Sequence, residues 1–345
     1  MPLTSSRSGQ TVSHPGLKRR RVLALGAGLL ASPLRVLAQP AGKIWRIGFL
    51  GVRSRSTPSN PQPHYDAFVL GMRDLGYVEG KNLVIEWRFA DGNYERLPAL
   101  AVELVQTKPD LIFTHSTAAT AALKRATSTI PIVASPVGDM VGSGFVASLG
   151  RPGGNITGTT AMDVELIPKH LELLKIITPG MSRVALLANP GNASHSRMLI
   201  SAQAVAQRVG VKIIPVEGRN LEEVERAFAT MRRERVDGLM VLSDAFFISL
   251  RPQIPALAIR YKLPSMFYYR EDVIAGGLIS YGQNVSDSYR RAATYVDKIF
   301  KGRKPADLPV EQPLKFDMLI NRKTATLLGL KISQEMLLRA TEVIE

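Results

Sequence analysis

The sequence repeats one pattern, in which short apolar runs of strand length alternate with longer segments of helical periodicity. The strands expected in the first half start at residues 46, 83, 110 and 131, and those in the second half start at 183, 211, 238 and 264. When a helix separates two strands, the second strand returns parallel to the first and helices cover both faces of the sheet. The repeat therefore predicts an α/β protein with two doubly wound parallel-sheet lobes.

The segment after Tyr281 departs from this repeat. It predicts one more helix over 286–300, a connection rich in proline and charge, and a final strand and helix within 315–328. The chain would leave the first lobe near 158, leave the second near 280 and cross again near 313, so we expect the lobes to be joined by a three-strand hinge. The expected units are 43–158 with about 282–312 as the N-terminal lobe, and 159–281 with about 313–345 as the C-terminal lobe.

Residues 1–38 have the composition of a cleaved export signal. Lys18-Arg19-Arg20-Arg21 precedes an apolar stretch over 22–30, and Val36-Leu37-Ala38 offers small residues to a signal peptidase. This stretch is shorter than the roughly 20 apolar residues of a transmembrane helix, and it lacks the polar face of an amphipathic surface helix. We therefore expect an exported, periplasmic protein, and the paired arginines favour the twin-arginine route.

The excess of positive charge does not indicate a nucleic-acid partner. The chain has 44 Lys and Arg against 29 Asp and Glu, and six of these positive charges lie within residues 1–42, which contain no acid. The other basic residues are dispersed, without the clustering and interleaved aromatics of a nucleic-acid groove. The absence of cysteine excludes disulfides, thiolate-bound metals and a cysteine nucleophile.

The chain also lacks catalytic motifs. Its five histidines include no pair with metal-ligand spacing, and it contains neither G-x-S-x-G nor a phosphate-binding loop. Residues 142–147 fit G-x-G-x-x-A, and Asp163 follows about 20 residues later, as in a dinucleotide fingerprint. This segment does not directly follow a strand, so we expect a closely packed helix there instead. We expect no catalytic residue, no metal and no cofactor.

Ligands of parallel α/β sheets bind beyond the carboxyl ends of the strands, and two facing lobes place those ends on either side of one cleft. Ser116 and Thr117 offer hydroxyls and backbone N–H groups to a carboxylate, and Asp244 suits an ammonium or a hydroxyl. Helix N-capping and core packing explain the same side chains without a ligand. The candidate ligand-binding residues are Ser54, His115, Ser116, Thr117, Val137, Asp139, Asn189, Asn192, Ser243, Asp244, Tyr268 and Tyr281.

Several short motifs, taken together, are typical of one protein family. They are Arg46-Ile47-Gly48-Phe49-Leu50, Leu75-Gly76-Tyr77-Val78-Glu79-Gly80-Lys81-Asn82, Thr129-Ile130-Pro131-Ile132-Val133, Asp139-Met140-Val141-Gly142-Ser143-Gly144, Arg151-Pro152-Gly153-Gly154-Asn155-Ile156-Thr157-Gly158 and Ala275-Gly276-Gly277-Leu278. Over about 43–345 the chain resembles the substrate-binding proteins of ABC transporters, in the branch of tryptophan- and tyrosine-type binding proteins. The resemblance implies a type I periplasmic binding protein fold and an ABC permease and ATPase as partners in the membrane.

In family members that bind aromatic amino acids, the positions matching Ser116-Thr117 hold the ligand carboxylate and the position matching Asp244 holds the ammonium. This sequence departs from the family in two places, since His115 opens the turn and Met140 stands where proline is usual. The resemblance implies an exported solute-binding protein, expected to be monomeric, for a small polar solute such as an amino acid. The alternatives are an exported α/β enzyme and a ligand-sensing receptor subunit of the same fold.

Overall fold

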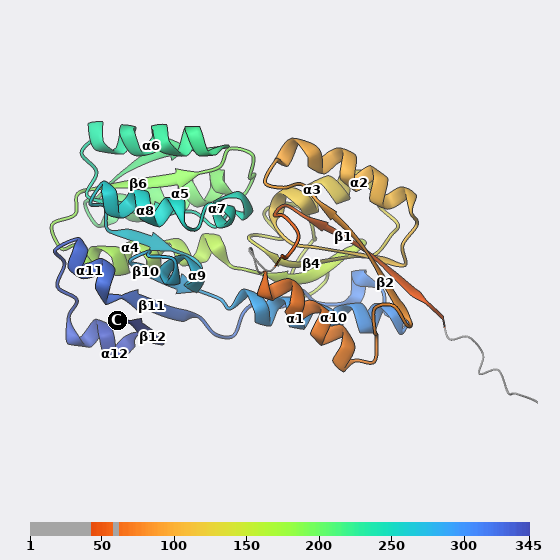
Figure 1. The fold of residues 1–345 in the computed structure, drawn as a ribbon. Helices are drawn as coiled ribbons and strands as arrows, with labels where there is room; N and C mark the ends of the chain where they lie inside the picture. Colours follow the sequence, from red (N-terminus) through yellow and green to blue (C-terminus); the bar gives the residue numbers. More distant parts are fainter. Residues whose placement is uncertain (1–42, 58–61) are drawn as a thin grey trace, which may run out of the picture. The chain divides into compact units, whose positions relative to one another are not determined.

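Two separate β-sheets organise the chain in the computed structural model, which describes residues 43–57 and 62–345 (Figure 1). Residues 43–345 form one unit by their contacts. The export signal expected over 1–38 lies outside the described residues. In the described part of the chain, no helix is both long enough and apolar enough to cross a bilayer.

The first sheet has five strands in the order β2-β1-β3-β4-β5, all parallel. Side chains of β1 alternate between its two faces, because successive residues of a strand point in opposite directions. Ile47 and Phe49 join one buried core and Leu50 joins another. The strands are β1 (Trp45–Gly51), β2 (Leu83–Phe89), β3 (Leu111–Thr114), β4 (Ile132–Val137) and β5 (Ile156–Thr160).

Helices cover both faces of this sheet, and together they form what we call the N-terminal lobe (Figure 1). Helix α1 packs lengthwise on α10, where Gly71 permits close contact because a Cβ there would lie 3.0 Å from the Cβ of Ala293. On the other face, a Cβ at Gly48 would lie 2.8 Å from Cγ of Leu104 in α2. The helices are α1 (Pro63–Asp74), α2 (Leu97–Gln106) after the 3-10 turn Tyr94–Arg96, α3 (Thr117–Ala126) and α10 (Val285–Phe300).

The second sheet has seven strands in the order β12-β11-β10-β9-β8-β6-β7 and forms, with its helices, the C-terminal lobe. Val184 and Leu186 face the core beneath α4 and α5, whereas Ala185 and Leu187 face the core beneath α6 and α8. The strands are β6 (Arg183–Ala188), β7 (Lys212–Glu217), β8 (Gly238–Val241), β9 (Ser265–Phe267), β10 (Ile279–Gly282), β11 (Asp317–Asn321) and β12 (Glu342–Ile344). The helices are α4 (Asp163–Ile177), α5 (His195–Arg208), α6 (Leu221–Arg233), α7 (Ala245–Ser249), α8 (Gln253–Arg260), α9 (Arg270–Ile274), α11 (Arg322–Leu327) and α12 (Gln334–Arg339).

The chain passes between the two sheets three times, after β5, after β10 and before β11. The predicted two-lobe α/β fold with three connections is therefore confirmed, and each of the eight predicted strands is present within one residue of its expected start. The first sheet includes β5 as far as Thr160. The detailed limits of the lobes stay a prediction.

Three local expectations are wrong, and several further elements were not predicted. The second sheet is not wholly parallel, because β10 and β11 pair antiparallel. The helix expected over 248–261 is two helices, α7 and α8, interrupted before Gln253. No helix forms over 142–147, where Gly144 has a φ of 69° and the carboxylate of Asp139 accepts a hydrogen bond from Gly142 N, which stabilises turns instead. Strands β5, β10 and β12 and helices α4, α9 and α12 are additional elements that the repeat did not predict.

Candidate ligand-binding site

A small buried cavity lies where the carboxyl ends of strands from both lobes meet. Residues that follow β1, β3 and β4 form its N-terminal wall, and residues around α4, α7 and β9 form its C-terminal wall. Its volume is about 40 Å³. Six of the predicted residues line this cavity: His115, Ser116, Thr117, Asn192, Ser243 and Asp244.

The turn His115-Ser116-Thr117 connects β3 to α3. Ser116 is the N-cap of α3, with a φ of 72°, and its Oγ accepts a hydrogen bond from Ala119 N at 3.4 Å. The N–H of Ser116 donates to the carbonyl of Pro136 at 3.2 Å, which fixes the turn against the loop that follows β4. Helix N-termini favour anions, so this turn has the geometry expected of a carboxylate clamp.

His115 is buried, and neither of its ring nitrogens has a hydrogen-bond partner among the described residues. Its ring lies 5.6 Å from that of Tyr289 and 6.0 Å from that of Phe49. Burial, together with the charge of Arg53, holds the pKa of His115 well below its usual value, so the ring is neutral at pH 7. An unpartnered neutral imidazole in the wall can donate one hydrogen bond and accept another.

Arg53, which follows β1, lines the cavity, whereas the predicted residue Ser54 is exposed and does not line it. Only 3% of the Arg53 surface is exposed, and its guanidinium contacts Nε2 of His64 and lies 5.8 Å from the ring centre of Tyr65. Nε of Arg53 has no hydrogen-bond partner in the described part of the chain. The sequence contained a signal for this residue, because a cation directly after a buried strand of a parallel sheet lies at the ligand-binding edge.

Asp163 is another cavity residue outside the predicted set, because its sequence context indicates only a dinucleotide fingerprint. It is the first residue of α4 and is 5% exposed. Burial raises the pKa of its carboxyl group to about 7, with Ser243 opposing the shift and Glu165 and Asp139 adding to it. Gly138 allows the close approach of the two lobes here, because a Cβ at that position would lie 2.9 Å from Oδ2 of Asp163.

Asp244 is buried at the start of α7, and both of its carboxylate oxygens already accept hydrogen bonds. Oδ1 accepts from Phe246 N at 3.0 Å and from Nδ2 of Asn189 at 3.1 Å. Oδ2 accepts from Nδ2 of Asn192 at 2.9 Å and from the hydroxyl of Tyr94, on the N-terminal lobe, at 2.8 Å. A carboxylate has about four acceptor positions, so Asp244 takes an ammonium only if one of these donors withdraws.

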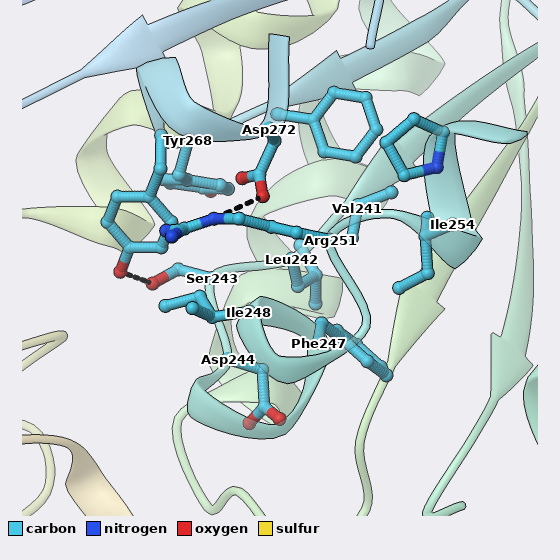
Figure 2. Close-up of a pocket in the computed structure, with 13 residues that line it drawn as sticks. Val241, Leu242, Ser243, Asp244, Phe247, Ile248, Arg251, Ile254, Tyr268 and Asp272 are labelled. Carbon is cyan, nitrogen blue, oxygen red and sulfur yellow. Dashed lines mark hydrogen bonds and ion pairs between the residues drawn. The ribbon is translucent and has the colours of Figure 1, made fainter. Parts of the chain in front are cut away.

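Figure 2 shows a neighbouring pocket in the C-terminal lobe, which shares Ser243, Asp244, Ile248 and Tyr269 with the cavity. Oγ of Ser243 lies 2.5 Å from the hydroxyl of Tyr269, and Nε of Arg251 lies 3.0 Å from Oδ1 of Asp272. The carboxylate of Asp244 points away from Arg251 (Figure 2). Asp272 and Glu271 neutralise the charge of Arg251 within the lobe.

The other predicted residues lie outside the cavity. Tyr268 lines the neighbouring pocket and donates to the backbone carbonyl of Asp163 at 2.9 Å. Tyr281 packs on Phe316, and Val137, the last residue of β4, is buried in the hydrophobic core. Asn189 contributes through its bond to Asp244 instead of lining the wall.

Asp139 does not line the cavity either, because it forms a contact between the lobes. Its Oδ2 accepts from Nε of Arg197, in α5 of the C-terminal lobe, at 2.8 Å. The same guanidinium donates to Oγ of Ser143 at 2.9 Å. This contact and the Tyr94–Asp244 hydrogen bond join the two lobes. No group of three or more His, Asp or Glu side chains suited to a metal occurs among the described residues.

Two parallel-sheet lobes with a polar cavity at their facing strand ends define the type I class of periplasmic binding proteins. The chain belongs to the family of ABC transporter substrate binding proteins, whose family model matches residues 60–344.

Named relatives agree with this assignment. The chain is 27% identical over 264 residues to the tyrosine-binding protein of Clostridioides difficile, covering 76% of each protein. A conserved domain protein of Vibrio cholerae has a similar structure, with a TM-score of 0.79 at 28% identity, covering 87% of this chain and all of that one. A domain from Streptococcus pneumoniae solved in complex with L-Trp matches with a TM-score of 0.78 at 25% identity, covering 87% of this chain and 99% of that one.

Proposed function

We propose that this protein is the exported solute-binding component of an ABC import system and that its solute is an amino acid. The observation that carries the proposal is the buried cavity at the facing strand ends, into which both lobes direct polar groups. A solute that contacts both lobes binds the closed form more tightly than the open form, and this difference in affinity drives hinge closure. Similarity to a tyrosine-binding protein and to a domain solved with L-Trp supports an amino acid as the solute class.

The size of the cavity indicates how the solute enters. A volume of about 40 Å³ suffices for roughly three water molecules and is too small for an amino acid. The contacts between the lobes, Asp139–Arg197 and Tyr94–Asp244, must therefore break before the solute can bind. The proposal thus includes an open form that exchanges solute and a closed form that docks on the permease.

The rest of the proposal concerns the protein outside its site. The protein is a periplasmic monomer that carries solute to the permease, and the paired arginines within 1–38 direct it to the twin-arginine route. Monomeric state is measured by light scattering of the purified protein. The export route is tested by replacing Arg19, Arg20 and Arg21 with lysines, which blocks twin-arginine export and leaves general secretion intact.

Isothermal titration with each of the twenty amino acids, after unfolding and refolding to remove carried solute, tests the proposed function. A true solute at 100 times its Kd adds about 2.7 kcal/mol to stability, so a parallel thermal scan shows a rise of several degrees. Sugars, nucleobases and dicarboxylates serve as comparison solutes. Binding of a sugar or nucleobase in preference to every amino acid would overturn the assignment of the solute class.

A further inference from the structure

We propose that Arg53 and Asp163 are the charged groups that bind the solute, with Arg53 pairing with its carboxylate and Asp163 with its ammonium group. This inference rests on the proposed function, because it names the parts of an amino acid that the two walls of the cavity recognise. Neither residue belongs to the Ser116-Thr117 and Asp244 clamp that the family resemblance implies.

Arg53 is a buried cation without a counter-ion. Its guanidinium stays charged at any pH a protein tolerates, and it forms no ion pair with any carboxylate in the described part of the chain. Residues 1–42 and 58–61 contain no acid that could serve instead. Burying an unpaired charge destabilises the protein. An anion that enters the cavity and pairs with the guanidinium therefore offsets a large part of this unfavourable free energy.

The groups around Arg53 are neutral and cannot take that role. His64 and His115 are both buried, and burial, followed by the charge of Arg53, lowers the pKa of each ring well below its usual value. The hydroxyls of Tyr65, which lies beside Arg53, and of Tyr289, which lines the cavity, are also buried, and burial raises the pKa of both. The N-terminal wall thus presents one positive charge among uncharged side chains, which favours a ligand carboxylate on this side.

Asp163 is the complementary group on the C-terminal wall. It forms no ion pair with any described residue, and burial disfavours its ionised form. An ammonium group beside it would stabilise the carboxylate and offset the cost of burial. Asp244, the other cavity carboxylate, accepts three hydrogen bonds from its own lobe and a fourth from Tyr94. Among the described side chains, Asp163 hydrogen-bonds with only the hydroxyl of Ser243, so it has more unused acceptor capacity for the ammonium.

Arg53 and Asp163 line the same cavity but do not pair with each other, so their charges remain available to a ligand. Tyr269 lies within electrostatic reach of both: burial raises its pKa most, Asp163 raises it further and Arg53 lowers it. An α-amino acid carries one negative and one positive group a few bonds apart. The two walls therefore complement a zwitterion with a defined orientation across the cleft.

The experiment compares each tight-binding amino acid with two analogues, its decarboxylated amine and its deaminated acid, by titration calorimetry. The wild-type protein should bind the amino acid more tightly than either analogue. Arg53→Met should lower the affinity for the amino acid by at least about 30-fold, and the variant should no longer prefer the amino acid over the amine. Asp163→Asn should lower the affinity for the amino acid by a similar factor, and the variant should no longer prefer the amino acid over the deaminated acid.

Controls separate binding from folding and from net charge. Arg55→Met and Glu172→Gln remove the same charges at exposed positions, and they should leave affinity unchanged. The melting temperature of ligand-free Arg53→Met should not fall, because the variant removes an unpaired buried charge. Arg53→Lys keeps the charge without the planar fork, so it should bind the amino acid with intermediate affinity.

The outcomes distinguish this inference from the proposed function. If the wild-type protein binds an amino acid and both cavity variants bind it with unchanged affinity, the Arg53–Asp163 assignment fails while the proposed function stands. If the deaminated acid binds the wild-type protein as tightly as the amino acid, the role of Asp163 is wrong. If no amino acid binds the wild-type protein, the proposed solute class and this inference both fail.

Discussion

The two walls of the cavity differ in how much of their hydrogen-bonding capacity is already used. On the C-terminal wall, Asp244 is held by four donors and Ser243 is paired with Tyr269. On the N-terminal wall, Nε of Arg53 and both ring nitrogens of His115 have no partner among the described residues. Apart from Asp163, the C-terminal wall is therefore formed before a solute arrives, whereas the N-terminal wall gains most of its polar contacts from the solute.

The strongest test of this contrast is Asp244→Ala. The substitution leaves Asn189, Asn192 and the N-terminus of α7 without their acceptor, and we expect it to destabilise the ligand-free protein by about 4 kcal/mol. Chemical denaturation of the refolded protein measures the loss. An unchanged free energy of unfolding would show that the C-terminal wall is not a preformed network.

A pH titration of stability is the second test and concerns Asp163. Its pKa is raised from 3.8 to about 7 in the folded protein, so the folded state binds its proton more tightly than the unfolded state. The contribution of Asp163 to stability is therefore most favourable below about pH 4 and declines as the pH rises to about 7.

Asp163→Asn does not titrate, so the melting temperature of the ligand-free variant should exceed that of the wild-type protein increasingly between pH 4 and pH 7. We expect a difference of a few degrees at the upper end. Measuring the difference between two proteins cancels the opposite trend from His64, His115 and His170, whose pKa values are lowered by burial. A difference that does not vary with pH would contradict an unpaired buried carboxylate on this wall.

Contacts between the walls predict a smaller effect. Arg197→Met removes the bonds from α5 to Asp139 and Ser143, which join the two lobes. The pair is partly exposed, so we expect about 1 kcal/mol less stabilisation of the closed form and about five-fold weaker solute binding. Small-angle scattering should show a larger radius of gyration for the ligand-free variant, and an unchanged radius and affinity would remove this contact from the closing mechanism.

Ser54→Ala should have the smallest effect. Ser54 is exposed and does not line the cavity, so stability should stay within about 0.5 kcal/mol and solute affinity should not change. Titration calorimetry measures the solute affinity of this variant and of Arg53→Met, so the effects of two adjacent residues are compared directly. A large loss of affinity in the Ser54 variant would mean that the segment after β1 rearranges on binding.

Arg53 and Ser54 show how much of the site can be predicted from the sequence. Apolar runs identified the strands, and the parallel arrangement identified the loops at their carboxyl ends, which is why six of the predicted residues line one cavity. The choice between Arg53 and Ser54 depends on how the backbone turns after Gly51, which residue periodicity does not specify. Asp163 was missed because α4 has no place in the strand–helix repeat, and its carboxylate reaches the site only through the glycine at position 138.

The contact between α1 and α10 has a consequence for the order in which the molecule can fold. Helix α1 ends at Asp74, but its packing partner begins only at Val285, and Phe68, Met72 and Tyr289 share one buried core. The second sheet is likewise completed only by β11 and β12, which lie near the end of the chain. During synthesis, both halves therefore expose apolar surface until the last fifth of the polypeptide has emerged, and exposed apolar surface promotes aggregation of an incomplete chain.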